Sequence, residues 1–178
     1  MGRRTELAVR TRADLLAAAK RLFGERGYPD TGIADIAAAA GRAVGSFYRH
    51  FAGKEELLAA LRHELAESAP PSPDGDDAIR AHVTACWTAL RTHRPTAIAL
   101  LQSAVAAAPA SGTLWRELTG WTAPLRRHLE ARGVADPELV AAAVGAMLAG
   151  LNHALPAGDD RVADTVTNLL LHGLPQSS

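Results

Sequence analysis

The sequence predicts an all-α protein, and three observations support this fold class. Alanine-rich segments carry apolar residues at three- and four-residue spacing along most of the 178 residues. No segment alternates apolar and polar residues as a half-exposed strand would. Gly27 and Gly41 fit the ends of predicted helices, and Pro95 and Pro137 fit first-turn positions of others.

The first helix is expected to begin after Thr11 and to end at Gly27. The Thr11 hydroxyl would cap the helix, with Asp14 three residues on as its partner in a capping box. An apolar stripe then faces inward: Leu15, Ala19, Leu22 and Phe23.

A second, shorter helix is expected over residues 33–40. Gly32 is its expected N-cap, and Asp35 lies in its first turn, where a carboxylate interacts favourably with the helix dipole. Gly41 follows and can adopt the left-handed conformation that a sharp turn needs.

A third helix is expected over residues 44–51, in the segment GRAVGSFYRHF. Its spacing of i, i+3 and i+7 predicts that Val44, Phe47 and Phe51 point inward. A fourth helix should begin after Gly53, with an apolar stripe of Leu57, Leu58, Leu61 and Leu65.

Residues 69–77, APPSPDGDD, form an expected loop, either within one helical body or as a linker between two domains. Beyond it we expect helices near residues 78–92, 96–107, 113–132, 137–154 and 160–172. Pro95 and Pro137 fit first-turn positions, whereas Pro124 lies inside a helical pattern and should kink or break it.

Charge is distributed unevenly, although the formal net charge is +0. Residues 1–54 contain ten Lys/Arg and five Asp/Glu, and the remainder contains nine and fourteen. This split favours an N-terminal part that faces nucleic acid. The single cysteine, Cys86, fits a reducing compartment, and no secretory signal or membrane-length apolar run is visible, so we expect a soluble, cytoplasmic protein.

Two short helices joined by a glycine-bearing turn, the second polar on one face and aromatic on the other, predict a helix-turn-helix. In such a unit the second helix enters the DNA major groove. Gly45 lets the backbone approach DNA closely, and Lys54 can hold a phosphate. The other groups suited to phosphates or base edges are Arg42, Ser46, Tyr48, Arg49 and His50.

Residues 28–58, YPDTGIADIAAAAGRAVGSFYRHFAGKEELL, resemble the DNA-binding signature of the TetR family of tetracycline-repressor-like regulators. The resemblance covers about the first third of the chain. It implies that Thr31 and Ile33 lie near the DNA backbone. It further implies that Arg42, Val44, Gly45 and Ser46 face the groove, and that Tyr48, His50 and Lys54 contact phosphates.

Three positions depart from that family pattern. Gly32 replaces a hydroxyl residue, and Ala43 stands where a serine often caps the third helix; loss of that cap costs about 1 kcal/mol. Arg42 replaces a small or apolar residue and adds a charge beside the groove.

The C-terminal part carries no catalytic motif, so we expect neither an enzyme nor a cofactor. His82 and Cys86 share a helix face, but a zinc site needs a third ligand, and core packing is the favoured interpretation. An effector pocket, implied mainly by the family resemblance, has these candidate lining residues, which an ordinary core could equally contain: His82, Cys86, Trp87, Leu101, Gln102, Trp115, Trp121, Met147 and Asn152.

The last two helices have broad apolar stripes that could pair with a second copy or cover the monomer core. The family resemblance places a dimer interface here. Its candidate residues are Val140, Val144, Met147, Leu148, Leu151, Val162, Val166, Leu169 and Leu170.

Together these features predict a DNA-binding domain over residues 1–53 and a helical effector-binding and dimerisation domain over residues 54–178. The expected function is that of a homodimeric regulator, a repressor that binds double-stranded operator DNA and is released by a small molecule, with no membrane partner. Two alternatives remain: a helical ligand carrier or enzyme without DNA binding, and an architectural DNA binder without an effector.

Overall fold

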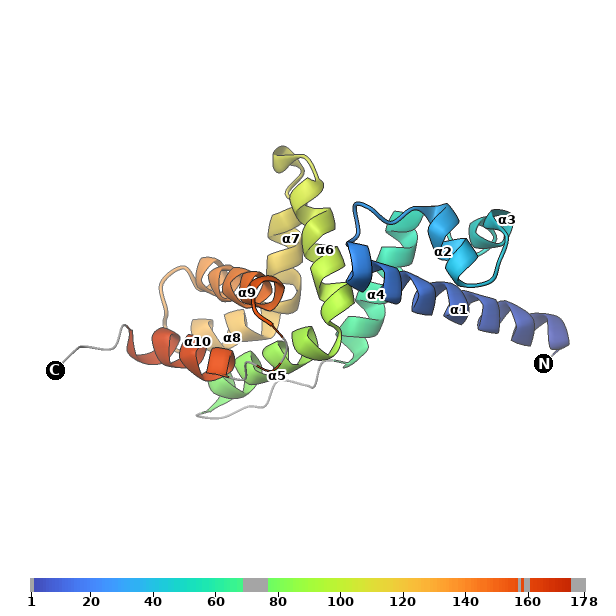
Figure 1. Ribbon diagram of the computed structural model, residues 1–178. Coiled ribbons are helices and arrows are strands. Elements are labelled where there is room, and N and C mark those ends of the chain that lie inside the picture. Colours follow the sequence, from blue (N-terminus) through green and yellow to red (C-terminus); the bar gives the residue numbers. More distant parts are fainter. Residues whose placement is uncertain (1, 69–76, 157, 159–160, 174–178) are drawn as a thin grey trace.

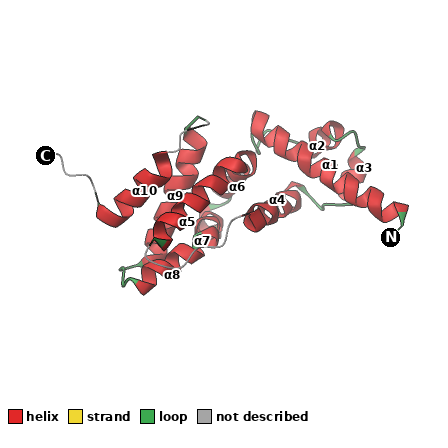
Figure 2. Cartoon of the chain, turned by 90° about the horizontal axis from the view of Figure 1, so that it is seen from below, coloured by secondary structure: helices red, strands yellow, loops and turns green. Residues whose placement is uncertain are grey.

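The computed structural model describes residues 2–68, 77–156, 158 and 161–173, and within them every regular element is helical, which confirms the all-α prediction. Helices α1 to α4 form one end of the molecule and α5 to α10 the other (Figures 1 and 2). None of the helices in these ranges is long and apolar enough to cross a membrane. The elements are α1 (Arg3–Arg26), α2 (Ile33–Ala39), α3 (Val44–Tyr48), α4 (Lys54–Ser68), α5 (Ala78–Thr92), α6 (Arg94–Ala106), the short 3-10 helix η1 (Pro109–Ser111), α7 (Thr113–Trp121), α8 (Ala123–Ala131), α9 (Pro137–Ala154) and α10 (Arg161–His172).

Helix α1 starts earlier than the sequence predicted. It begins at Arg3, after an extended Gly2, and its N-terminal turns project beyond α2 (Figure 1). Thr11 is buried inside the helix, so its expected role as N-cap is wrong. Residues 3–10 contain neither glycine nor proline, and nothing in that stretch stops the helix. The predicted end is confirmed, because Gly27 has a φ of 83° and donates its N–H to the Phe23 carbonyl.

Proline and glycine positions were the dependable boundary signals elsewhere. The pattern over residues 113–132 breaks into α7 and α8 at Thr122, two residues before Pro124, and the predicted break before that proline is confirmed. Pro95 and Pro137 lie in the first turns of α6 and α9. The predicted third helix is too long, because α3 ends at Tyr48. Of the loop expected over residues 69–77, only Asp77 lies within the described residues.

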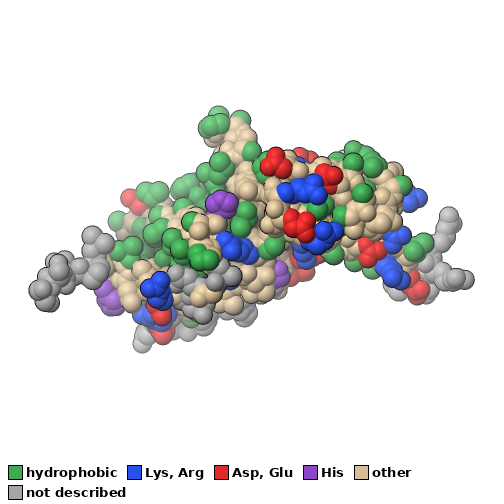
Figure 3. All heavy atoms as spheres, viewed as in Figure 1, with side chains coloured by type: hydrophobic (Ala, Val, Ile, Leu, Met, Phe, Trp, Pro, Cys, Tyr) green, Lys and Arg blue, Asp and Glu red, His purple; other side chains and the backbone are tan. Residues whose placement is uncertain are grey.

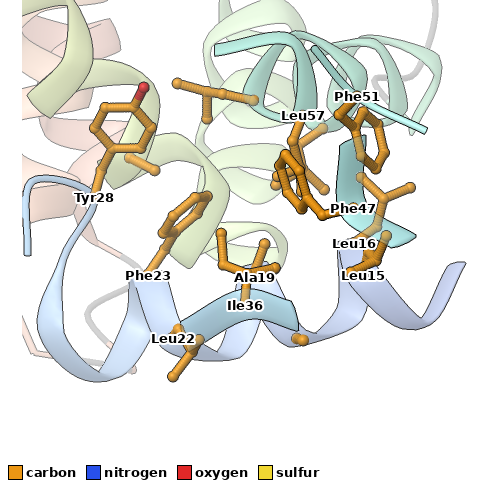
Figure 4. Close-up of a cluster of buried hydrophobic side chains, with 14 of the residues drawn as sticks. Leu15, Leu16, Ala19, Leu22, Phe23, Tyr28, Ile36, Phe47, Phe51 and Leu57 are labelled. Atoms are coloured by element: carbon orange, nitrogen blue, oxygen red, sulfur yellow. The ribbon is translucent and has the colours of Figure 1, made fainter. Parts of the chain in front are cut away.

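Side chains from α1, α2, α3 and α4 together form a first hydrophobic core. Apolar side chains of α1 and α2 point toward Phe47, Phe51 and Leu57, which come from α3, the residues after it, and α4 (Figure 4). Phe47 and Phe51 pack on each other with ring centroids 5.6 Å apart. Burial of Phe47 fixes which face of α3 points away from the protein, and Phe51 packs on Phe47 from the residues just after the helix.

Helix α6 completes this first core from the C-terminal part of the chain. Ala99 and Leu100 are buried within it, and the Gln102 side-chain oxygen accepts the Tyr28 N–H at 2.9 Å. At Gly24 an added Cβ would lie 3.3 Å from Pro95, so α1 and α6 approach closely. Packing therefore crosses the expected boundary after residue 53, and that division remains a proposal.

A second core fills the helices from α5 onward. Trp87, Leu125 and Leu148 are buried in it. Close approach of α7 and α9 depends on Gly145, where an added Cβ would lie 3.1 Å from the Leu118 carbonyl oxygen. Arg94 donates hydrogen bonds to carbonyls at the C-terminal end of α9, which have no partner within the helix itself.

His82 is a buried histidine of this second part. Burial, and secondarily the nearby His128, lowers the pKa of His82 from 6.5 to about 4. Below pH 6.5 the unfolded chain therefore binds a proton that the folded chain does not bind until about pH 4. The stability from neutral His82 is complete above pH 6.5 and is lost as the pH falls from 6.5 toward 4.

We predict that the free energy of unfolding decreases by about 2 kcal/mol between pH 7.5 and pH 5 because of His82. Urea unfolding at the two pH values measures this loss. His82→Gln should remove most of the difference, whereas His63→Gln, at an exposed position, should keep it. An equal pH dependence in His82→Gln and the wild type would contradict the assignment.

Candidate nucleic-acid interface

The turn between α2 and α3 is built as the sequence predicted. Gly41 has a φ of 65°, and the N–H groups of Gly41 and Arg42 bond back to carbonyls of the last turn of α2. At the other end of α2, the Asp35 carboxylate accepts the Gly32 N–H at 3.1 Å. Ala43 precedes α3 and supplies no side-chain cap, so the expected loss of that cap is confirmed.

One face of α3 is open to solvent. Val44 is 41% exposed and Tyr48 is 55% exposed, so the prediction that Val44 points inward is wrong. Gly45 lies between them, and no atom comes within 4 Å of an added Cβ there. The Tyr48 ring packs edge-on against Phe47, with centroids 5.6 Å apart at an interplanar angle of 80°, which supports the exposed phenol.

Other candidate residues around α3 are engaged with the protein. Arg49 is exposed and donates a hydrogen bond of 3.0 Å to the buried Ser46 hydroxyl. His50 and Ile33 are half-buried, and Ile33 packs against the first core. The guanidinium of Arg42 pairs with the Asp14 carboxylate of α1 at 2.8 Å instead of projecting freely.

Thr31 and Lys54 form an internal network between the α1–α2 loop and α4. Thr31 is buried and donates its hydroxyl proton to the Gly27 carbonyl at 2.7 Å. The Lys54 ammonium donates to the carbonyls of Tyr28 and Thr31, at 2.8 and 2.9 Å, and lies 4.2 Å from the centroid of the Tyr28 ring. Both groups therefore hold the loop in place, and their expected phosphate contacts stay predictions.

Sequence reasoning missed two residues of α1 that contact the α3 region. Asp14 pairs with Arg42, and the Arg12 guanidinium lies 5.1 Å from the centroid of the Phe51 ring. Because the sequence prediction started the helix after Thr11, it assigned Asp14 to a capping role and gave Arg12 no role. The earlier start of α1 follows from the absence of helix breakers in residues 3–10, which was the available signal.

The structure gathers only some of the candidate pocket residues. Cys86, Trp87, Trp121 and Met147 meet in the second core, with His82 and Asn152 also buried. The Cys86 sulfur lies 3.3 Å from His82 Nε2, and no group of three or more metal-ligating side chains occurs among the described residues.

Two pocket candidates lie outside the second core. Gln102 bonds to the Tyr28 backbone at the junction with α1, and Trp115 is 43% exposed, so neither lines the second core. Leu101 is half-buried on α6. A cavity of about 240 Å³ lies beside Thr122 and Arg126, and another of about 480 Å³ lies between α1 and α4. Neither of these two is lined by a predicted pocket residue.

Four of the nine dimer candidates also need correction. Val144, Leu148, Val162 and Val166 are buried in the core of the single chain, so they are not available to a second copy. The remaining candidates are half-buried or exposed: Val140, Met147, Leu151, Leu169 and Leu170.

The fold and this site together define a helix-turn-helix protein with a helical C-terminal body. Residues 15–61 match the family model described as "Bacterial regulatory proteins, tetR family". The HTH-type transcriptional regulator TtgR of Pseudomonas putida is 48% identical over 69 residues, which are 38% of this chain and 33% of that protein. The HTH-type transcriptional repressor KstR2 of Mycobacterium tuberculosis is 48% identical over 50 residues, 28% of this chain and 25% of that protein.

Solved structures match nearly the whole chain. The TetR family transcriptional regulator PfmR from Thermus thermophilus superposes with a TM-score of 0.69 at 26% identity, over 91% of this chain and 99% of that one. The transcriptional regulator FadR from Bacillus subtilis, solved in complex with stearoyl-CoA, shares the fold with a TM-score of 0.68 at 16% identity, over 92% and 99% of the two chains. Residues 15–61 are thus similar to the DNA-binding part of the TetR family, and the matched segment spans about a third or less of the curated relatives' own length.

We predict that Gly45→Ala separates folding from DNA binding. The free energy of unfolding should rise by roughly 0.5–1 kcal/mol, since alanine favours the helix and the added methyl meets no protein atom. Affinity for a duplex that the wild-type protein enriches from a random pool should fall about tenfold, because the methyl blocks close backbone approach. Urea unfolding and fluorescence anisotropy measure the two effects.

Gly120→Ala is the matched control for this change, because Gly120 is also helical and open to solvent. It should stabilise the fold similarly and leave DNA affinity unchanged. Wild-type duplex affinity in Gly45→Ala would show that α3 does not approach DNA at this point.

Proposed function

We propose that this chain is a homodimeric transcriptional regulator, a repressor that binds a pseudo-palindromic operator and releases it when a small molecule binds the C-terminal body. The observation that carries the proposal is the exposed face of α3, where Val44, Gly45 and Tyr48 face solvent together. A glycine flanked by an apolar and a hydroxyl-bearing side chain suits a major groove. The groove edge carries thymine methyl groups and hydrogen-bonding atoms, and phosphates lie beside it.

The positions of individual basic side chains support a DNA partner more strongly than the net charge of the chain does. The first 54 residues have a formal charge of +5, and Arg12 and Arg49 are exposed near α3. Acidic side chains are interspersed with basic ones over the N-terminal helices in the view of Figure 3. Binding would therefore depend on a few positioned phosphate contacts, and its salt dependence should be moderate.

The dimer interface is proposed on the outer face of α9 and α10. Leu139, Ala143, Ala146 and Gly150 follow one another at helical spacing and are exposed, as is Leu169 on α10. Hydrophobic side chains gather over α9 in Figure 3. Small residues let helices approach closely, and a two-fold axis through this face would present two copies of α3 to one side of a duplex.

We predict that Leu139→Glu breaks the dimer and the operator complex together, because Leu139 is 59% exposed and would face its symmetry mate. Val105→Glu is the matched control, at an exposed apolar residue on α6 away from this face. Analytical ultracentrifugation should show a dimer for the wild type and the control, and a monomer for Leu139→Glu.

The same proteins test DNA binding. The wild type should enrich a pseudo-palindrome whose half-sites lie about one helical turn or a multiple apart. Its affinity should fall with salt, and Leu139→Glu should bind that duplex at least about tenfold more weakly, because it engages one half-site at a time. If the wild type enriched no sequence, or bound all duplexes alike, the regulator proposal would be wrong.

An effector site is proposed among buried polar groups of the second core. The Trp87 indole N–H, the Asn152 side-chain oxygen and the Thr167 hydroxyl are buried without a hydrogen-bond partner in the described structure. Buried polar atoms without partners are costly, and a ligand that supplied the missing partners would stabilise the conformation that binds it. Gln102 and Leu100 of α6, which contact the first core, would carry that preference to the helix-turn-helix.

We predict that at least one metabolite or antibiotic from a thermal-shift screen raises the melting temperature and weakens duplex binding. Asn152→Leu should lose the thermal shift while its duplex affinity without compound stays within about twofold. Compounds that stabilise the protein without weakening duplex binding would indicate an architectural DNA binder with no effector control.

The alternative of a carrier or enzyme without DNA binding is less well supported. Burial raises the pKa of the Cys86 thiol to about 12, so it stays protonated and unreactive at neutral pH. That alternative also leaves the open face of α3 unexplained. We place the protein's action in the cytoplasm, where operator DNA is found in a bacterial cell.

A further inference from the structure

The pair formed by Arg42 and Asp14 links the α2–α3 turn directly to α1. Arg42 Nη2 lies 2.8 Å from Asp14 Oδ2, and the two side chains are 29% and 37% exposed. Arg42 Nε is buried and has no hydrogen-bond partner among the described residues. The guanidinium is thus turned toward the protein, partly removed from water, with its charge compensated by one carboxylate.

This link acts where α3 has little support of its own. Helix α3 is five residues long, and Ala43 at its start provides no side-chain cap. An isolated helix of this length is unstable in water, so its position depends on tertiary contacts. Arg42 adjoins the N-terminal end of α3 with its pair to Asp14, and Arg12 lies over Phe51 just beyond the C-terminal end. Helix α1 therefore contacts the residues that flank the short helix on both sides.

The same geometry argues against a simple base contact by Arg42. To reach guanine, the guanidinium would have to leave the Asp14 carboxylate, which would then lie uncompensated close to the polyanionic duplex. An arginine that keeps its partner avoids this cost. Its charge is also largely neutralised toward phosphates, since Asp14 is within direct contact.

We propose that Arg42 is a positioning residue, which sets the orientation of α3 through Asp14 and does not read a base. The inference rests on the proposed function, because it concerns how the DNA-binding helix is held. Asp14, with no previous role at the interface, becomes part of the DNA-binding machinery without touching DNA. The departure of Arg42 from the family pattern is then a structural substitute for the missing cap at Ala43.

A double-mutant cycle in DNA binding tests this assignment. Asp14→Asn, Arg42→Met and the double variant are compared with the wild type on the duplex that the wild type enriches from a random pool. Each single change should weaken binding roughly three- to tenfold, and the double variant should bind no more weakly than either single one, because all three lose the same link. The salt slope and the enriched consensus should remain those of the wild type.

A direct DNA contact would give a different pattern. Arg42→Met would then lower the salt slope by about one per subunit or change the consensus, and Asp14→Asn would leave binding unchanged or strengthen it. Either result, or additive losses in the double variant, would overturn the proposal. Glu25→Gln is the matched control, since it removes the same charge from α1 but its partner Arg21 lies on α1 itself.

Hydrogen exchange of the free protein separates failure of this inference from failure of the proposed function. Asp14→Asn should speed amide exchange in residues 44–51 and leave α4 unchanged, whereas a loss of global stability would speed exchange in both. If the wild type enriched no duplex but α3 were selectively loosened, the regulator proposal would fail while the positioning role of the Arg42–Asp14 link stood. Unchanged exchange in α3 would rule out that role even if DNA bound.

Discussion

Burial of Phe47 and Phe51 is the interaction on which the site depends. Two large aromatic side chains leave water from a helix of only five residues and the turn after it, and burial of each contributes about 1.5–3 kcal/mol. Because side chains about half a turn apart point to opposite sides of a helix, burial of Phe47 turns Gly45 toward solvent, and the exposed Val44 and Tyr48 flank it. The surface proposed to face DNA is therefore a consequence of core packing.

The core that holds these phenylalanines is not confined to the N-terminal helices. Ala99 and Leu100 of α6 are buried in it, and Gln102 accepts the Tyr28 N–H from the loop that leads into α2. Lys54 ties the same loop to α4 through two carbonyls. The orientation of α3 is thus linked to the position of α6, and a ligand that favours one position of α6 could change DNA affinity without a contact near the DNA.

The sequence predicted the helices and their boundaries better than it predicted which side chains would be buried and which exposed. Gly41 and Pro124 marked boundaries because each restricts the backbone locally, whatever packs around it. The apolar stripe of α9 was ambiguous, since Val144 serves the chain's own core while Leu139 faces solvent, and both are aliphatic. Gln102 showed no local sign of its partner, because Tyr28 is 74 residues away. Pairings at that range follow from the tertiary fold and have no signature in either segment.

The Arg42–Asp14 link is another long-range pairing that the sequence did not predict. The role of each residue became clear only once the start of α1 was known. The helix-turn-helix lacks side-chain caps at both Gly32 and Ala43, and each missing cap costs about 1 kcal/mol or less. Asp35 offsets the first loss within α2. Nothing within α3 offsets the second, so stabilisation has to come from another element. Helix α1 can supply it through Asp14, because α1 runs unbroken through the position where a cap was expected and holds Asp14 beside Arg42.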